Sequence, residues 1–145
     1  MEIYSIGFTQ KTAEQFFSLL KNAGIRRLVD VRLNNVSQLA GFSKREDLQY
    51  FLREICCAEY RHEPLLAPTK EILDDYKKAK GDWPTFQRRF LKLMAQRQVE
   101  AKLSIKDFDV PTVLLCSEPT ADHCHRRFVL EYLQKKWKIV EIRHL

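Results

Sequence analysis

Residues 111–116 read Pro-Thr-Val-Leu-Leu-Cys, a continuous apolar run between a proline and a polar loop, and this stretch decides the fold class. A short run of this kind predicts a strand that is covered on both faces, as in a parallel sheet. It leads into residues 117–128, Ser-Glu-Pro-Thr-Ala-Asp-His-Cys-His-Arg-Arg-Phe, which read as a loop and the start of a helix. Since connecting loops carry much of a fold's chemistry, we expect the functional site in this connection.

Strand and helix patterns alternate along the rest of the chain. Period-two or continuous apolar patterns predict further strands at 2–9, 27–33, 58–62 and 137–142. Apolar residues at helical spacing, with start and stop signals, predict helices at 12–23, 43–57, 69–80, 84–98 and 123–136. Residues 102–109 are expected to be a polar connection. Capping-box spacing marks two of the helix starts, at Thr12 with Gln15 and at Ser43 with Glu46.

This alternation predicts the architecture. Strands that alternate with helices give a mainly parallel sheet flanked by helices on both faces, a Rossmann-like three-layer α/β fold. The 145 residues suit one compact domain spanning 1–145, and no linker or repeat interrupts them.

Composition narrows the function classes. No segment reaches the roughly 20 apolar residues of a membrane helix, and the N-terminus does not resemble a secretory signal, so we expect a cytoplasmic protein without membrane contact. The four cysteines are expected to be free thiols. A formal net charge of +6 favours an anionic small molecule or nucleic acid as the partner. The sequence assigns no cofactor and does not indicate the oligomeric state.

The carboxyl ends of parallel strands meet at one edge of the sheet, where ligands bind in folds of this kind. Three pieces of the chain come to that edge: Gly7–Thr9, Asp30 with Arg32, and Cys116–Arg126. Asp30 and Arg32 are two residues apart on a strand and therefore share a face. They are either an anion clamp, in which Asp30 orients the guanidinium, or a structural ion pair.

The residues at the start of the last helix favour anions, because the first turn of a helix has unpaired backbone amides and the positive end of the dipole. Helical spacing from Phe128 and Val129 predicts that His125 leans inward, while Arg126 lies one step round, between interior and solvent. Together with Arg32 these groups could cradle a phosphate. The competing interpretation is a solvated helix start with a core-facing histidine.

Two thiols lie in the same connection. Cys124, at a helix start beside histidines and arginines, is where a thiolate would be stabilised. The phosphatase-like spacing of a cysteine and an arginine six positions later is absent, and packing of Cys116 and Cys124 as small apolar residues is the competing interpretation. Glu118 has the type and place of a general acid or base. A zinc site on these cysteines and His123 or His125 lacks a standard spacing, so we expect no metal.

A set of motifs is spread over nearly the whole chain: Ser5-Ile-Gly-Phe-Thr9, Leu28-Val-Asp-Val-Arg32, Ser37, Phe42, Tyr60-Arg-His62, Leu114-Leu-Cys-Ser-Glu118 and Cys124-His-Arg126. With these motifs the chain resembles the domain-of-unknown-function family 488. The resemblance implies a compact α/β domain that brings together Asp30, Arg32, Cys116, Glu118, Cys124, His125 and Arg126, and it brings no settled activity. The sequence departs from the family at Phe8, where histidine is frequent, at Asn35, where proline is common, and at 65–68, which replaces a glycine-rich turn.

A looser similarity links the Asp-Val-Arg strand end and the later cysteine to rhodanese-type sulfurtransferases, without their arginine- and glycine-containing loop. The candidate catalytic residues are Glu118, His125, Cys116 and Cys124, and the candidate anion-binding residues are Arg32, Arg126 and Asp30. The leading hypothesis is an enzyme-like domain, a hydrolase or transferase, that binds a phosphate-bearing ligand such as a nucleotide. The alternatives are a non-catalytic nucleic-acid-binding module and a rhodanese-like sulfurtransferase that uses Cys116 or Cys124.

Overall fold

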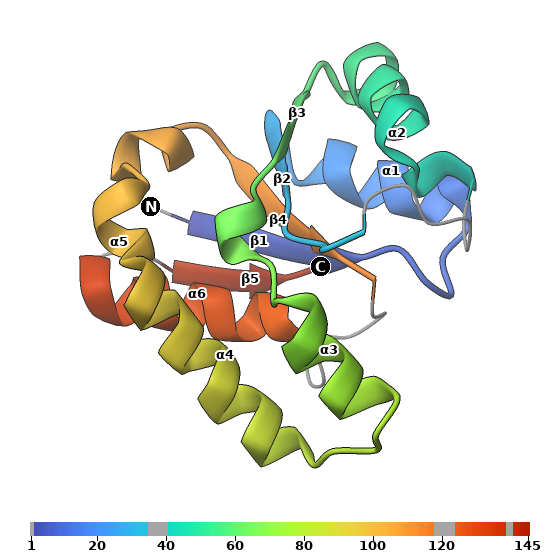
Figure 1. The fold of residues 1–145 in the computed structure, drawn as a ribbon. Coiled ribbons are helices and arrows are strands. Elements are labelled where there is room, and N and C mark those ends of the chain that lie inside the picture. The colour runs from blue at the N-terminus through green and yellow to red at the C-terminus, as the bar shows by residue number, and fades with distance from the viewer. Residues whose placement is uncertain (1, 35–40, 118–123, 139–140) are drawn as a thin grey trace.

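A computed structural model gives the fold in Figure 1 and describes residues 2–34, 41–117, 124–138 and 141–145. In this part of the chain a five-stranded, all-parallel sheet runs in the order β3-β2-β4-β1-β5. The strands are β1 (Glu2–Gly7), β2 (Arg27–Asp30), β3 (Glu59–His62), β4 (Thr112–Cys116) and β5 (Glu141–His144). The helices are α1 (Ala13–Asn22), α2 (Arg45–Phe51), α3 (Lys70–Lys77), α4 (Trp83–Arg97), α5 (Val99–Lys102) and α6 (His125–Trp137). The predicted three-layer α/β fold is confirmed.

Helices cover both faces of the sheet (Figure 1). Apolar side chains of α1 and α2 pack on one face with Ile6, Leu28 and Leu115, and we call this the α1 face. Side chains of α3, α4, α5 and α6 pack on the other face with Val29 and Leu114, and we call this the α6 face. Successive strand residues point to opposite faces, so the inner strands β1, β2 and β4 contribute to both cores.

β4 is the central strand, and all five of its residues are buried. This is the run that the sequence marks as the clearest buried strand, and helices packed on both faces of the sheet explain why its residues after Thr112 are apolar. The edge strands β3 and β5 alternate between exposed and half-buried residues. None of the helices that the structure describes is long and apolar enough to cross a membrane.

Side-chain caps mark the starts of α1, α3 and α4. Thr12 makes a capping box with Gln15, and Thr69 and Asp82 accept hydrogen bonds from the first turns of α3 and α4. The predicted capping box at Ser43 and Glu46 is wrong: Lys44 is the N-cap of α2, with no side-chain cap bond. Ser43 instead ends a short 3₁₀ turn and is fully buried.

Two predicted segments have different structures. Residues 43–57 do not form one α-helix, because α2 continues into a π-helical turn at Leu52–Cys56 that ends at Cys57 in the left-handed region. The expected polar connection at 102–109 contains the end of α5 and a 3₁₀ turn at Ile105–Phe108, where Phe108 is buried. Both segments are short, so the apolar period gives little signal there.

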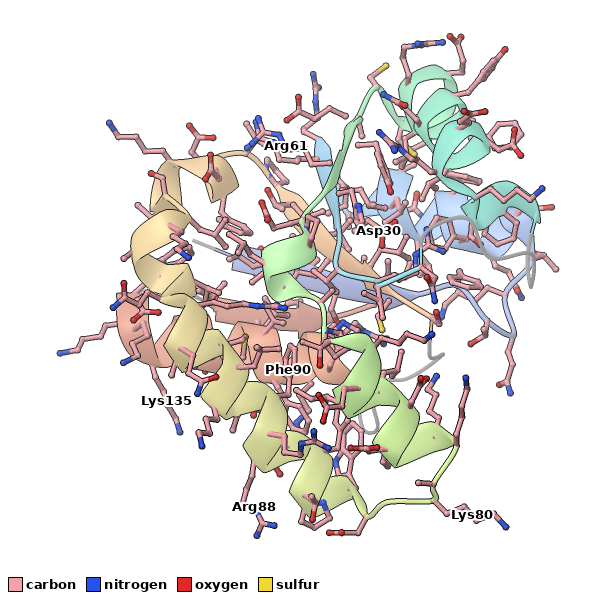
Figure 2. The ribbon with its side chains drawn as sticks, in the orientation of Figure 1. Asp30, Arg61, Lys80, Arg88, Phe90 and Lys135 are labelled. Atoms are coloured by element: carbon pink, nitrogen blue, oxygen red, sulfur yellow. The ribbon has the colours of Figure 1, made fainter. Side chains whose placement is uncertain are left out.

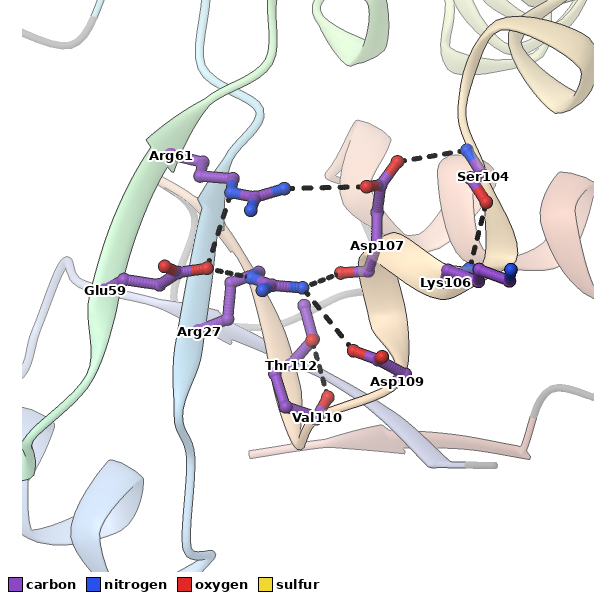
Figure 3. A network of polar contacts seen from close by, with 9 residues as sticks. All are labelled: Arg27, Glu59, Arg61, Ser104, Lys106, Asp107, Asp109, Val110 and Thr112. Atoms are coloured by element: carbon purple, nitrogen blue, oxygen red, sulfur yellow. Dashed lines mark hydrogen bonds and ion pairs between the residues drawn. The ribbon is translucent and has the colours of Figure 1, made fainter.

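Ion pairs join the amino ends of the strands, at the opposite edge from the expected site (Figure 3). Arg27 at the start of β2 donates to Glu59 of β3 and to the carbonyl of Asp107. Its side chain is only 13% exposed, whereas that of Arg61, 3.4 Å from Glu59 and 3.6 Å from Asp107, is 47% exposed. Arg27 is therefore the structural member of this network.

We expect Arg27→Met to lower the free energy of unfolding by about 1–3 kcal/mol, because it removes charge-assisted hydrogen bonds from a nearly buried group. Arg61→Met is the matched control, and it should change stability by less than about 1 kcal/mol because its ion pairs are half exposed. Urea denaturation of the two variants measures both values. Equal losses would contradict the assignment.

Candidate functional site

The carboxyl end of β4 lies at a reversal of the chain's direction across the sheet. The connections after β1 and β2 pass over the α1 face, whereas the connection after β4 leads to α6 on the other face. A crevice between adjacent strands whose loops leave in opposite directions is the usual ligand site of an open α/β sheet. Here the loops are tied together, because the amide and hydroxyl of Thr9 both donate to the carbonyl of Ser117, at 3.1 and 2.7 Å.

Cys116, the last residue of β4, contacts His125 in the first turn of α6. The Cys116 Sγ and His125 Nδ1 atoms are 3.5 Å apart. His125 Nε2 lies 2.7 Å from the carbonyl oxygen of Val31. Since a carbonyl only accepts hydrogen bonds, Nε2 carries a proton, and Nδ1 faces the thiol as an acceptor or as a second N–H. The ring also packs edge-on against Phe90 of α4, which fixes its plane.

Cys124 completes a compact cluster of side chains. It occupies the N-cap position of α6 but makes no side-chain cap hydrogen bond, so its sulfur does not do the usual work of that position. Its Sγ, the Cys116 Sγ and a ring nitrogen of His125 all lie within 4.8 Å of one another. All three residues are buried, and all four cysteines of the chain are free thiols.

The pKa values of the two thiols in this cluster are shifted in opposite directions. Burial raises the pKa of Cys116. The hydrogen bond from Cys124 and the charge of His125 lower it by more than burial raises it, so the pKa lies well below its ordinary value. Burial and the neighbouring Cys116 hold the pKa of Cys124 well above its ordinary value. Burial lowers the pKa of His125, but the charge of Cys116 outweighs it and the net pKa is raised. The three shifts favour ionisation of Cys116 and protonation of His125 and Cys124.

Arg126 adds a buried positive charge beside this cluster. Its side chain is fully buried, which corrects the prediction that it lies between interior and solvent. Nε donates to Ser5 Oγ at 3.1 Å, and Ser5 Oγ in turn lies 2.5 Å from His144 Nδ1. The pKa of Lys11 is lowered by burial and then by the charge of Arg126, so a second cation lies within electrostatic reach. Arg127, by contrast, pairs with Glu131 at 2.8 Å on the surface.

Asp30 and Arg32 form the predicted pair at the end of β2. Two guanidinium nitrogens of Arg32 donate to the two carboxylate oxygens of Asp30, at 2.9 and 2.8 Å. Tyr60 donates to Asp30 at 2.6 Å, and Arg32 also donates to the carbonyl of Ser43 at 2.7 Å. The guanidinium lies 5.2 Å from the ring centroid of Phe8, the residue that replaces the family's frequent histidine. Among the side-chain nitrogens of Arg32, Nη1 alone is buried with no hydrogen-bond partner among the described residues.

The two groups of residues lie at one edge of the sheet but on opposite faces. Asp30 pairs in register with Leu115, which belongs to the α1 face, and Cys116 is the next residue along β4. Paired residues share a face, so Asp30 and Cys116 point in opposite directions. Figure 2 labels Asp30 at the end of β2 and Phe90 on α4, across the sheet. The expected common pocket is thus divided by the strands, with the Val31 carbonyl as the link between its halves.

The structure therefore brings together four of the candidates, Cys116, Cys124, His125 and Arg126, and it positions Asp30 and Arg32 across the sheet from them. Glu118 and His123 lie outside the described residues. Sequence reasoning missed Ser5, Lys11 and Tyr60 as members of these clusters. A serine in the otherwise apolar part of β1 is a readable signal, because a buried hydroxyl requires a partner.

Two sulfurs and a ring nitrogen within 4.8 Å of one another are also a donor set that a soft metal ion accepts. The set offers three donors from the described residues. The sequence expectation of no metal stays a prediction, and the metal content of the purified protein is the measurement that decides it.

Fold and cluster together define the class: a three-layer α/β domain with a buried cysteine–histidine cluster at the end of its central strand. The model of the family "Domain of unknown function DUF488" matches residues 12–133, and the chain belongs to this family. The resemblance stated from the sequence is confirmed. No curated protein and no solved structure matches the chain.

Proposed function

We propose that the domain is a cysteine-dependent hydrolase or transferase for an anionic small molecule, with Cys116 as the nucleophile. The observation that carries this proposal is the 3.5 Å contact between Cys116 Sγ and His125 Nδ1, with the opposite ring nitrogen held on a backbone carbonyl. A nucleophile in contact with a base that a third group orients is the recurring arrangement of covalent catalysis.

His125 has two tasks in this proposal. As an imidazolium it stabilises the thiolate before the reaction, and it then has a proton to give to the leaving group. The Val31 carbonyl keeps Nδ1 directed at the sulfur throughout, because it accepts the hydrogen bond of the other nitrogen. Glu118, which follows the cluster in the chain, keeps its role as the proposed general acid or base.

An anionic substrate fits the charges around the nucleophile. Arg126 is buried beside the cluster, and Lys11 lies within reach of its field. Lys11 also lines an open groove of about 500 Å³ that runs along α1 from Thr9 to Asn22. A phosphate-bearing ligand is one candidate within this anionic class, and the anionic group of the substrate would lie on the Lys11 side. The Asp30–Arg32 pair is assigned a structural role, since its hydrogen bonds are made within the protein.

Nucleic-acid binding is the competing class. The basic residues of α4 that could form a binding stripe are partly engaged elsewhere: Arg97 donates to three backbone carbonyls between 64 and 67, and Arg89 pairs with Asp75 at 2.6 Å. Binding to DNA or RNA that weakens steeply with salt would favour this class over the enzyme.

We expect the rate of Cys116 alkylation to depend on pH with a midpoint well below the value of about 8.5 for a free thiol, because Cys124 and His125 lower the pKa of Cys116. Iodoacetamide labelling of the reduced protein, followed by peptide mass spectrometry, follows each cysteine separately. The anionic reagent iodoacetate should label Cys116 faster relative to iodoacetamide than it labels a free thiol, and inorganic phosphate should slow the reaction.

Cys57→Ser removes an exposed thiol on the π-helical turn and is the control that should leave the Cys116 profile unchanged. A midpoint equal to that of a free thiol would rule out the activated nucleophile. So would one equivalent of zinc in the purified protein that is lost in both Cys116→Ser and Cys124→Ser.

A further inference from the structure

Cys124 has a place that the proposed nucleophile alone does not explain. It is only 2% exposed, it occupies an N-cap position without a side-chain cap bond, and its sulfur lies within 4.8 Å of the Cys116 sulfur. A serine, threonine or aspartate would serve the helix better there. The Cys124 side chain thus lies against Cys116, and this contact indicates its function.

We infer that Cys124 is the resolving thiol for Cys116, and that the substrate is an anionic compound that carries sulfane sulfur, such as a thiosulfate or a persulfide. This inference rests on the proposed function and names its substrate class. A second thiol in contact with the first is useful when the covalent intermediate contains an S–S bond, because a thiol attacks sulfur readily. A phosphorylated or acylated Cys116 would be resolved by water instead.

The reaction balances in two steps. The Cys116 thiolate attacks the sulfane sulfur of thiosulfate, the S–S bond of the substrate breaks, and sulfite leaves with the electron pair. The product is a Cys116 persulfide. The Cys124 sulfur then attacks Cys116 Sγ, a Cys116–Cys124 disulfide forms, and sulfide leaves with the Cys124 proton. The sulfane sulfur is reduced, the two thiols are oxidised, and an external thiol returns the protein to its dithiol form.

The charges of the cluster set the order of the two steps. While Cys116 is a thiolate, its charge and hydrogen bond keep Cys124 protonated, so Cys124 does not compete for the substrate. Formation of the persulfide moves the negative charge from Cys116 Sγ to the outer sulfur, which can take up the Cys124 proton, while the buried Arg126 stays in place. Cys124 then ionises more easily and attacks. The sulfurs must close from within 4.8 Å to the S–S length of about 2.05 Å.

The test uses thiosulfate and the reduced full-length protein without oxygen, so that electrons from the thiols can pass only to the sulfane sulfur. The wild type should release one equivalent each of sulfite and sulfide, and its intact mass should fall by two hydrogens through a Cys116–Cys124 bond. Cys124→Ser should release sulfite but no sulfide, and it should accumulate a form one sulfur atom heavier. Cys116→Ser should release neither sulfite nor sulfide, and its intact mass should not change.

Cys56→Ser is the matched control, because Cys56 is a half-buried thiol on another segment, and it should behave as the wild type. Cys124→Ala serves if the serine variant does not fold, with circular dichroism as the check. A stable persulfide on the wild type, or undiminished sulfide release from Cys124→Ser, overturns the inference. Absence of sulfite release overturns the substrate class. If any of these outcomes is found while Cys116 alkylation keeps its low midpoint, the proposed nucleophile stands and only this further inference fails.

Discussion

Asp30→Asn should lower the free energy of unfolding by about 3–5 kcal/mol, because it leaves the Arg32 guanidinium buried without a counter-charge. Asp30 is fully buried and Arg32 is 3% exposed. The carboxylate accepts hydrogen bonds from the Arg32 backbone amide, from two Arg32 side-chain nitrogens and from Tyr60. Asparagine keeps the volume but loses the charge and one acceptor, so the loss reports the ion pair and not a cavity. Chemical denaturation with two optical probes measures it.

Two further variants separate the charge from the hydrogen bonds. Tyr60→Phe removes only the Tyr60 donor and should cost about 1.5–3 kcal/mol, the range for a bond to a charged group. The double variant Asp30→Asn with Arg32→Met removes both charges and should recover part of the loss. Glu54→Gln, in the exposed pair with Arg53, should change stability by about 0.5 kcal/mol at most. If Asp30→Asn costs no more than Glu54→Gln, the pair does not hold the end of β2.

The Asp30–Arg32 pair is also the part of the site that sequence alone predicts best. Asp30 ends β2 and Arg32 follows two residues later, so their short separation along the chain is enough to bring them together whatever β2 pairs with. The partners from other segments are different. Tyr60 reaches Asp30 only because β3 lies beside β2, and the Ser43 carbonyl reaches Arg32 through a 3₁₀ turn that replaces the predicted capping box.

The relation between the two halves of the site depends on register, which the sequence does not contain. Asp30 pairs with Leu115, and a shift of one residue would have paired it with Cys116 and put both on one face. The burial of Arg126 has a similar origin. Helical spacing places it at the margin of the inward face, but Ser5, 121 residues away, provides a partner that lets it be fully buried. The fold class needed only local patterns, whereas these contacts needed the assembled sheet.

His125→Gln should move the alkylation profile of Cys116 to higher pH and slow its alkylation at pH 6.5 by at least about tenfold, since each unit of pKa changes the thiolate fraction tenfold well below the midpoint. Glutamine can still donate to the Val31 carbonyl, but it carries no charge. The charge of His125 is one of the groups that lower the pKa of Cys116. When the His125 charge is removed, fewer groups oppose the effect of burial, which raises the pKa of Cys116.

The directions of the two pKa shifts define the pH range in which the Cys116 thiolate and the His125 imidazolium exist together. The folded pKa of Cys116 is lowered, so the thiolate contributes stability above the ordinary thiol pKa, and this is lost as the pH falls through the lowered pKa. The folded pKa of His125 is raised, so the imidazolium contributes stability below its ordinary pKa, and this is lost as the pH rises through the raised pKa. The ion pair therefore persists between the lowered pKa of Cys116 and the raised pKa of His125.

His62→Gln is the matched control for this substitution. His62 Nε2 lies 2.9 Å from the carbonyl of Arg32, so it too is a histidine bound to a backbone carbonyl just beyond β2, but from β3 instead of α6. It should leave the Cys116 profile unchanged while it tests the general effect of losing such a bond. Equal shifts in His62→Gln and His125→Gln would mean that the profile follows the structure of the strand ends and not the charge at Nδ1. An unchanged midpoint in a folded His125→Gln protein would separate His125 from the nucleophile, because the imidazolium would then contribute nothing to the stability of the Cys116 thiolate.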